Sequence, residues 1–266
     1  YSFGYIIDRE WKTEMLLQRT QTDSAIKRIH NIQRMDSFET YTFLDSLNKI
    51  RSGIDNLNLT PQQVTNYYTN SLFRLNTLNV VSSSNINYLE PVRGDLQGQK
   101  LLSEMITYLG LVRANIYYAL HSNQSPEQTI EGLRFTFDMY RSYQRELFLK
   151  GSLGVTHAFE KINVNTDYRP TIVYIQNLLN KGRFDSTYDA EKWWTVSANG
   201  VDELKKIQRQ ALETAQQGVA RIYEKEKVAR NRSLIFLVAS IILVIILITY
   251  TITIITKTLD ELNRAA

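Results

Sequence analysis

The chain of 266 residues contains no cysteine, so disulfide bonds, a thiolate nucleophile and a cysteine-ligated zinc site are all excluded. Glycine and proline are also scarce, with 11 and 4 residues, and long stretches contain neither. Because these two residues mark turns and interrupt helices, their scarcity argues against a turn-rich all-β fold. The composition therefore predicts an all-α protein.

Motifs that would indicate catalysis, metal binding or nucleic-acid binding are absent too. The sequence has no glycine-rich phosphate loop, nucleophile elbow or paired-carboxylate motif. His30, His121 and His157 are scattered without a second ligand at helical spacing. The net charge of +4 is spread along the chain, not gathered in a basic stripe with aromatic residues, which suits anionic lipid or a small anion better than nucleic acid. We therefore expect no enzyme activity in this chain, no metal, no cofactor and no nucleic-acid partner.

One long hydrophobic run is present, from Ser233 to Thr256, and it contains no charged residue, proline or glycine. A helix of about 20 apolar residues crosses a hydrocarbon core of about 30 Å. A buried helix of a soluble core is the alternative, but β-branched runs of this length are unusual there. We predict a transmembrane helix over 233–256. The chain begins at Tyr1 without an initiator Met or a signal peptide, so we interpret it as a fragment or a processed form, which leaves room for a first membrane helix upstream.

The charges that flank this run do not fix its orientation. More basic residues precede it than follow it, and these are Lys225, Lys227, Arg230 and Arg232 before, and Lys257 and Arg264 after. Counted alone, they place the large N-terminal region in the cytoplasm. Long domains, however, translocate largely regardless of flanking charge.

Helical stretches fill the rest of the chain. They are predicted over Trp11–Gly53, Pro61–Ser82, Leu96–His121, Ser125–Leu149, Pro170–Lys181 and Ala190–Arg232. Two of them begin with a hydroxyl residue followed by proline, Thr60–Pro61 and Ser125–Pro126, which is typical of an N-cap and a first helical position. In the last stretch, apolar residues recur every three or four positions at Val201, Leu204, Ile207, Ala211, Ala215, Val219 and Ile222. A single helix is therefore expected to run from the N-terminal region into the bilayer and to carry a shift across it.

Arg113 is the charged residue of greatest interest, because the residues around it, such as Leu109, Val112 and Ile116, predict a buried environment. A buried guanidinium needs an anion, either a carboxylate of the chain, such as Glu104 or Asp138, or a ligand. Both readings stay open from the sequence. Trp193 and Trp194 are expected to anchor a helix start in the core, with stacking against a ligand as the alternative.

Several segments together resemble the nitrate- and nitrite-sensing domain, usually called the NIT domain, of bacterial receptors. They keep the order of the family and read YSFGYI at 1–6, LLQRTQTDSAI at 16–26, IRSGID at 50–55, TPQQVTNYY at 60–68, YLGLVRANIYYAL at 108–120, SYQRELFL at 142–149 and DAEKWWTVSANGVDELKKIQ at 189–208. The segment at 108–120 resembles the Gly-x-Glu-Arg-Ala motif, with Val112 in the place of Glu and Arg113 in the place of Arg. The resemblance implies antiparallel helices outside the cytoplasm that bind a small anion through arginines.

The chain departs from the family at two binding positions. The arginine of the family's first helix would lie upstream of Tyr1, and IVYIQN stands at 172–177, where the family often carries another arginine. Arg113 carries over, whereas Arg169 and Arg183 are neighbours of the second position. The ligand-binding residues implied by the resemblance are therefore Arg113, Arg169 and Arg183.

After the membrane run, ITKTLDELNRAA at 255–266 resembles the opening of a HAMP linker, with Thr258 where proline is common. HAMP modules are parallel coiled coils, so the resemblance implies a homodimer.

We thus predict an antiparallel helical bundle with a C-terminal transmembrane helix, divided into a helical sensor domain over 1–228, a membrane helix over 233–256 and the start of a cytoplasmic linker over 257–266. The expected function is sensing of nitrate or nitrite by a receptor of the plasma or inner membrane, with the sensor domain periplasmic. The alternative is a module without a small ligand, which dimerises the receptor or binds a periplasmic protein.

Overall fold

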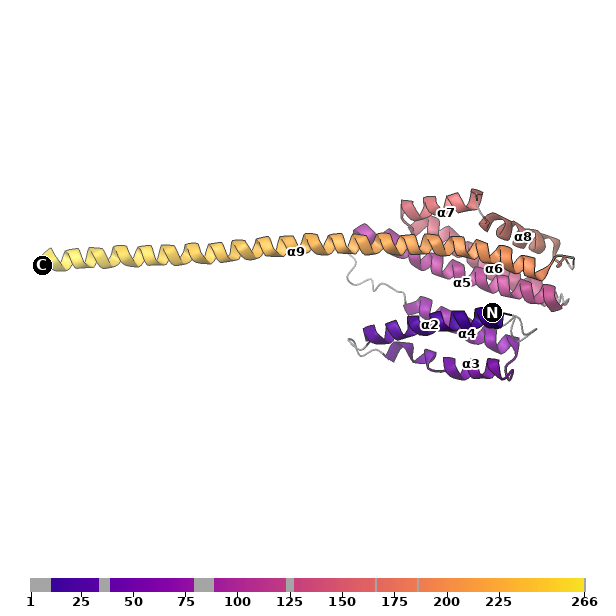
Figure 1. Cartoon of the computed structure of the whole chain (residues 1–266). Coiled ribbons are helices and arrows are strands. Elements are labelled where there is room, and N and C mark those ends of the chain that lie inside the picture. Colours follow the sequence, from indigo (N-terminus) through magenta and orange to yellow (C-terminus); the bar gives the residue numbers. More distant parts are fainter. Residues whose placement is uncertain are drawn as a thin grey trace.

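The computed structural model describes residues 11–33, 39–78, 89–122, 127–165, 167–185 and 187–265, and over these ranges the chain forms helices and no strands. The prediction of an all-α fold is confirmed. Two groups of helices lie side by side, and the last helix extends far beyond both (Figure 1). The first group is a small N-terminal layer and the second is a longer bundle.

The bundle has four legs that alternate in direction. Its helices are α5 (Arg93–Ser122), α6 (Glu127–Lys150), α7 (Leu153–Asn165), α8 (Tyr168–Lys181) and α9 (Ala190–Ala265). Helices α7 and α8 follow one another and together form the third leg (Figure 1). Short connections between successive legs favour this antiparallel arrangement, so the predicted antiparallel bundle is confirmed.

Two long-range hydrogen bonds fix how α6 lies against its neighbours. The amide of Ser152, just after α6, donates to the carbonyl of Gly94 at the start of α5, over 3.1 Å. Nη2 of Arg134, early in α6, donates to the carbonyl of Leu179, near the end of α8, over 2.8 Å. Both contacts join an early part of one helix to a late part of the other, as antiparallel helices require.

Large aromatic side chains fill the centre of the bundle. Trp193, Tyr140, Tyr168, Phe137 and Phe159 are all essentially inaccessible to solvent. The hydroxyl groups of Tyr140 and Tyr168 hydrogen-bond to each other, which satisfies two polar atoms that have lost water. This pair joins α6 to α8 inside the core.

The N-terminal layer consists of α2 (Lys12–Gln33), the 3-10 turn η1 (Glu39–Leu44), α3 (Leu47–Asp55) and α4 (Pro61–Leu78). Its own core is small and consists of Met15, Ile54 and Val64. The predicted start of α4 is confirmed by a capping box, because Thr60 N donates to Gln63 Oε1 over 2.9 Å and Gln63 N donates to Thr60 Oγ1 over 3.3 Å. The other predicted start, Ser125–Pro126, lies outside the described residues.

Two helix predictions are wrong. The single stretch expected over Trp11–Gly53 is divided into α2, η1 and α3. Thr, Asp, Ser and aromatic residues dominate 36–43, and their low helix propensity explains the interruption. Helix α7 was not predicted at all, although Ser152 caps it by accepting a hydrogen bond from the Val155 amide over 3.3 Å.

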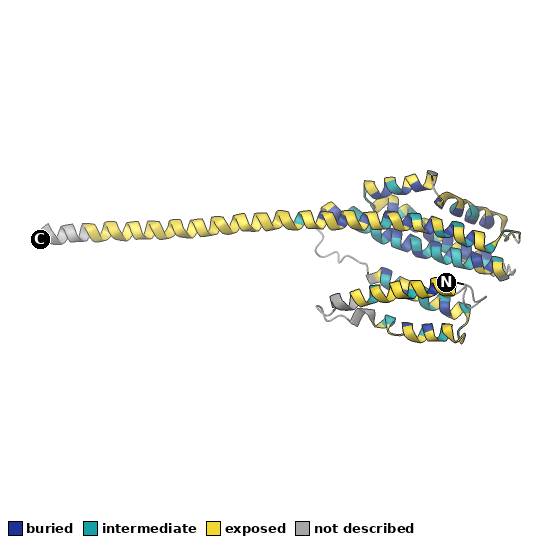
Figure 2. Ribbon diagram, viewed as in Figure 1, coloured by how far each residue is buried: buried dark blue, intermediate teal, exposed yellow. Residues whose placement is uncertain are grey.

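Helix α9 contains 76 residues, which corresponds to about 114 Å at 1.5 Å per residue. Its predicted apolar stripe is buried in the bundle from Val201 to Ala215, but Val219 is 41% exposed. Near Gly218 the helix contacts the short 3-10 turn η3 (Glu90–Val92), and beyond Ile222 it leaves the bundle (Figure 2). The stripe therefore ends where the bundle ends.

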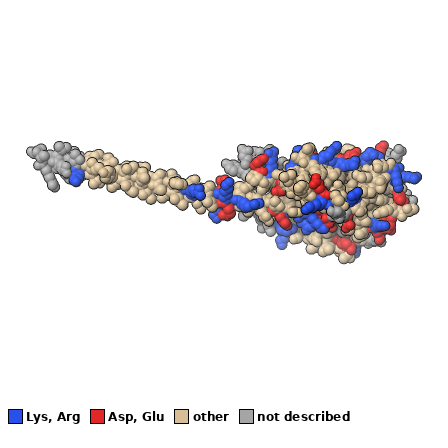
Figure 3. Space-filling view, turned by 90° about the horizontal axis from the view of Figure 1, so that it is seen from above, with Lys and Arg blue, Asp and Glu red and all other residues tan. Residues whose placement is uncertain are grey.

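The exposed part of α9 includes the predicted membrane helix. It is long and apolar enough to cross a bilayer, and none of its apolar residues is buried in the chain. A stretch without charged side chains separates the basic residues near the bundle from Lys257 along this helix (Figure 3). The helix continues without a break through Ala265, so no loop separates the span from the residues that follow it.

A buried polar cluster joins the N-terminal layer to the bundle. Asn76 of α4 donates from Nδ2 to Glu104 Oε2 and to Thr107 Oγ1, each over 3.1 Å, and accepts from Ser103 Oγ over 2.8 Å. Burial raises the pKa of the Glu104 carboxyl, although the hydrogen bond from Asn76 lowers it in part. Burying the ionised Glu104 carboxylate thus costs the folded state free energy.

We predict that Glu104→Gln raises the melting temperature at pH 8 and that this gain disappears near pH 4. The folded chain binds the Glu104 proton more tightly than the unfolded chain does. The contribution of Glu104 to stability is therefore fully present below the unfolded pKa of about 4.3, and it is lost as the pH rises through the folded pKa. Gln keeps an acceptor for Asn76 but has no charge to bury. Thermal unfolding in detergent between pH 4 and 8, with exposed Glu131→Gln as the control, tests this. If the difference in melting temperature between Glu104→Gln and the wild type did not change with pH, the prediction would be contradicted.

Helices α8 and α9 approach closely at Gly200. A Cβ atom there would lie 2.6 Å from Oγ1 and 3.0 Å from Cβ of Thr171, and Thr171 is fully buried. Oγ1 of Thr171 donates to the carbonyl of Val196 over 3.1 Å, so its side chain cannot move away freely. Only glycine fits this contact.

We predict that Gly200→Ala lowers stability by about 1–3 kcal/mol, the usual cost of overpacking a core. Gly132→Ala is the matched control, because a Cβ there meets no atom within 4 Å and helix propensity favours alanine by about 1 kcal/mol. The two variants are therefore expected to shift the melting temperature in opposite directions, measured by circular dichroism. Equal shifts would show that the contact between α8 and α9 is loose.

Candidate functional site

Arg113 lies on α5 where this helix packs against the first turns of α9. Its guanidinium carbon lies 3.5 Å from the centroid of a Trp194 ring, and its Nη2 donates to the Trp194 carbonyl over 3.2 Å. In return, Nε1 of Trp193 donates to the Arg113 carbonyl over 3.0 Å. A cation–π contact and two hydrogen bonds thus connect α5 to the start of α9 at this residue.

The start of α9 is itself fixed by a local cap. Oδ1 of Asp189 accepts from the Lys192 amide over 2.6 Å, and the Asp189 carbonyl accepts from the Trp193 amide over 3.0 Å. The cap sets the position of both tryptophans on the first turn. Trp193 is fully buried, so its predicted role as a core anchor is confirmed, whereas Trp194 is only partly buried.

The Trp194 ring that covers the Arg113 guanidinium belongs to a cluster of aromatic side chains. The Trp194 ring has its centroid 5.9 Å from that of Trp11 and 5.2 Å from that of Tyr117. Tyr117 in turn stacks on His121. Trp11 is the first described residue, and the segment at 1–6 that resembles the family lies outside the described residues.

The carboxylates considered as internal partners of Arg113 are placed elsewhere. Glu104 is hydrogen-bonded by Asn76, and Asp138 is exposed on α6. Among the described residues, neither forms an ion pair with Arg113. The described contacts of Arg113 are therefore with aromatic rings and with a backbone carbonyl.

Arg169 and Arg183 lie at opposite ends of α8. Arg169 is the second residue of the helix, Arg183 follows its last residue by two, and both are exposed. They are 14 positions apart in the chain, which along the helix corresponds to about 20 Å. One small anion cannot contact both, so at most one of the two can belong to a site with Arg113.

Two arginines of the N-terminal layer were not predicted as site residues, although they line a cavity. Nη1 of Arg19 lies 2.9 Å from Oδ2 of Asp55, and Nη1 of Arg51 lies 2.5 Å from Oδ1 of Asp23. The pairs cross between α2 and α3, since each helix supplies one arginine and one aspartate. The available signal was the repeated Arg-x3-Asp spacing in QRTQTD and IRSGID.

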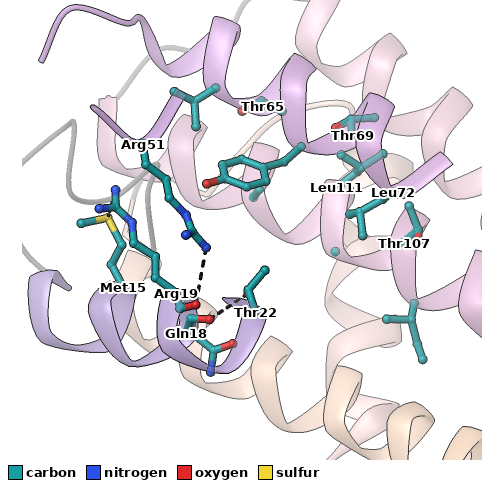
Figure 4. Close-up of a pocket in the computed structure, with 15 residues that line it drawn as sticks. Met15, Gln18, Arg19, Thr22, Arg51, Thr65, Thr69, Leu72, Thr107 and Leu111 are labelled. Carbon is teal, nitrogen blue, oxygen red and sulfur yellow. Dashed lines mark hydrogen bonds between the residues drawn. The ribbon is translucent and has the colours of Figure 1, made fainter. Parts of the chain in front are cut away.

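The cavity has a volume of about 400 Å³ and lies between the N-terminal layer and α5. Arg19, Arg51 and Met15 gather at one end, and Leu72, Leu111 and Thr107 lie at the other (Figure 4). Gly110, Leu111 and Ala114 of α5 form part of its wall, one turn or less from Arg113. Helix α5 thus separates the cavity from the contact with α9.

Comparison with known proteins gives one match. A sequence model described as nitrate and nitrite sensing matches residues 1–216, which is most of the chain. No curated protein and no solved structure matches the sequence. The matched range includes the N-terminal layer, most of the bundle and Arg113, and it ends shortly before α9 leaves the bundle. The chain therefore belongs to the nitrate- and nitrite-sensing family, NIT.

Proposed function

We propose that this chain is the sensing and membrane-spanning part of a signalling receptor, and that nitrate or nitrite binds next to Arg113. The observation that carries the proposal is the position of this arginine. It occupies the arginine place of the family motif and lies on the contact between α5 and α9, the only described helix that continues into the membrane run. A ligand at this point would act directly on the output helix.

The surroundings of Arg113 suit a small planar anion. A guanidinium presents planar N–H donors that can bond two oxygens of an oxyanion at once. The Trp194 ring covers one side of the guanidinium and is itself packed against the rings of Trp11 and Tyr117, which favours the exclusion of water from that side. A lower local dielectric strengthens a charge-assisted hydrogen bond relative to the same bond in water.

Binding would change the packing of α9 through Trp194. An anion that takes N–H groups of Arg113 competes with the Trp194 carbonyl and withdraws positive charge from the face of its ring. The first turn of α9 then has a different preferred position against α5. The ligand shifts this equilibrium only by the difference between its affinities for the two packings.

The continuous α9 passes that shift to an output module beyond Ala266. We propose that the sensor domain lies outside the cytoplasm, that 233–256 span the plasma or inner membrane and that 257–266 begin a cytoplasmic HAMP-like linker in a homodimer. The ten exposed residues 223–232 hold the bundle about 15 Å from the span. Their basic side chains then reach the lipid headgroups, which accounts for the charge that precedes the span.

We predict that the chain, solubilised in detergent, binds nitrate saturably in isothermal titration calorimetry and that Arg113→Ala weakens binding about 10- to 100-fold. A loss of this size corresponds to the usual free-energy contribution of hydrogen bonds to a charged group. Arg113→Lys should restore binding only in part, because an ammonium has no planar fork. Exposed Arg145→Ala is the control, and no more than one of Arg169→Ala and Arg183→Ala should reduce affinity.

Unchanged nitrate affinity in Arg113→Ala would contradict the proposed site. If the folded chain bound neither nitrate nor nitrite, the alternative of a dimerisation or protein-interaction module would be favoured, with Arg113 serving only to hold α5 against α9.

A further inference from the structure

The cavity between the N-terminal layer and α5 is distinct from the site at Arg113 and differs from it in size and polarity. Its volume of about 400 Å³ falls within the range of cavities that enclose organic molecules, about 300–1,000 Å³. An oxyanion of three or four heavy atoms would fill little of it. Arg113 is not among the residues that line it.

The charged end of the cavity has spare hydrogen-bond donors. The side chains of Arg19 and Arg51 are 13% and 10% exposed, and each bonds an aspartate through a single contact. Nη2 of Arg51 also donates to the Arg19 carbonyl over 3.4 Å, and Nη2 of Arg19 donates to Sδ of Met15 over 3.6 Å. Nε of each is buried and has no hydrogen-bond partner among the described residues. An unmet buried donor costs about 1–3 kcal/mol, so a ligand oxygen at this end would be stabilising.

The charge balance at this end favours a monovalent anion over a divalent one. Asp23 and Asp55 already compensate the two arginines, but their side chains are 58% and 50% exposed and therefore remain well hydrated. A monovalent anion adds a single uncompensated charge, whereas a phosphate group would add nearly two. A carboxylate also matches the paired Nε and Nη donors of a guanidinium in geometry.

The opposite end of the cavity is apolar. Leu72 of α4 and Ile106 and Leu111 of α5 supply its walls, with the methyl-bearing side chains of Thr69 and Thr107 between them. Figure 4 shows this end separated from the arginines along the length of the cavity. A ligand that fills both ends therefore needs an anionic head and a hydrophobic body.

We propose that the cavity binds a monocarboxylate with an aliphatic or aromatic body. The carboxylate bonds to Arg19 and Arg51, and the body packs against Leu72, Ile106 and Leu111. The chain thus has a binding site for an organic acid in addition to the proposed nitrate site, and Arg113 does not line this cavity.

Gly110 allows the cavity to be filled without touching the arginines. It lines the cavity, and a Cβ there meets no atom within 4 Å, so Gly110→Leu places a side chain in the space of the ligand body while improving helix propensity. Gly132→Leu is the matched control on α6, because a Cβ there is equally unobstructed and lies away from the cavity.

The test is titration calorimetry of hexanoate and benzoate into the whole chain in detergent, with acetate and hexan-1-ol as probes that lack the body or the charge. We expect saturable binding to wild type, Gly132→Leu and Arg113→Ala, and at least a tenfold loss in Gly110→Leu and in Arg51→Gln. Acetate and hexan-1-ol should bind at least tenfold more weakly than hexanoate.

The proposal is overturned if neither hexanoate nor benzoate binds, if Gly110→Leu binds as tightly as Gly132→Leu, or if hexan-1-ol binds as tightly as hexanoate. Circular dichroism of every variant shows whether it is folded. Because Arg113→Ala removes only the proposed nitrate site, failure of one proposal is distinguishable from failure of the other.

Discussion

The packing of α5 against its neighbours is the constraint on which the other features of this chain depend. One face of α5 carries Leu102, Met105, Leu109, Val112 and Ile116, all of which are fully buried in the bundle. Its other side contacts α4 through Glu104 and Thr107 and forms a wall of the cavity at Gly110 and Ala114. A change in the N-terminal layer can therefore reach α9 through α5, and also through the contact of Trp11, just before α2, with Trp194.

The N-terminal layer combines a small hydrophobic core with ion pairs that cross between its helices. Its own core contains three buried apolar residues, whereas the bundle core contains many more. The crossed pairs Arg19–Asp55 and Arg51–Asp23 connect α2 to α3, and Asn76 connects α4 to α5. Directional polar contacts of this kind give a defined geometry with limited stability. Such a layer can adjust to a ligand at a smaller cost than the bundle can.

Local signals explain most of what the sequence predicted correctly. The Thr60–Gln63 capping box depends on residues three apart, and the stripe from Val201 to Ala215 depends on the helical repeat, so neither requires knowledge of tertiary structure. Arg113 was found from a family motif. Its partner Trp194 could not be found in this way. The two residues are 81 positions apart, and their contact depends on how α5 and α9 pack.

The errors have the same origin. Arg19 and Asp23, like Arg51 and Asp55, are spaced for ion pairs within one helix, and only the relative position of α2 and α3 makes them pair between helices. Arg169 and Arg183 are close in sequence to one family position but lie at the two ends of α8. Helix α7 was missed because its cap at Ser152 follows a glycine and precedes another, and both weaken the helical pattern.

The contact of α9 with η3 at Gly218 gives the long helix a pivot. The arm from Trp194 to this pivot measures about 36 Å, and the arm from the pivot to Thr256 measures about 57 Å, at 1.5 Å per residue. A rigid lever with these arms inverts and enlarges a sideways displacement. A movement of about 1 Å at Trp194 would therefore become an opposite movement of about 1.6 Å at the far membrane surface. In the proposed receptor, a displacement no larger than the exchange of one hydrogen bond would thus be enough to move the far end of the membrane span.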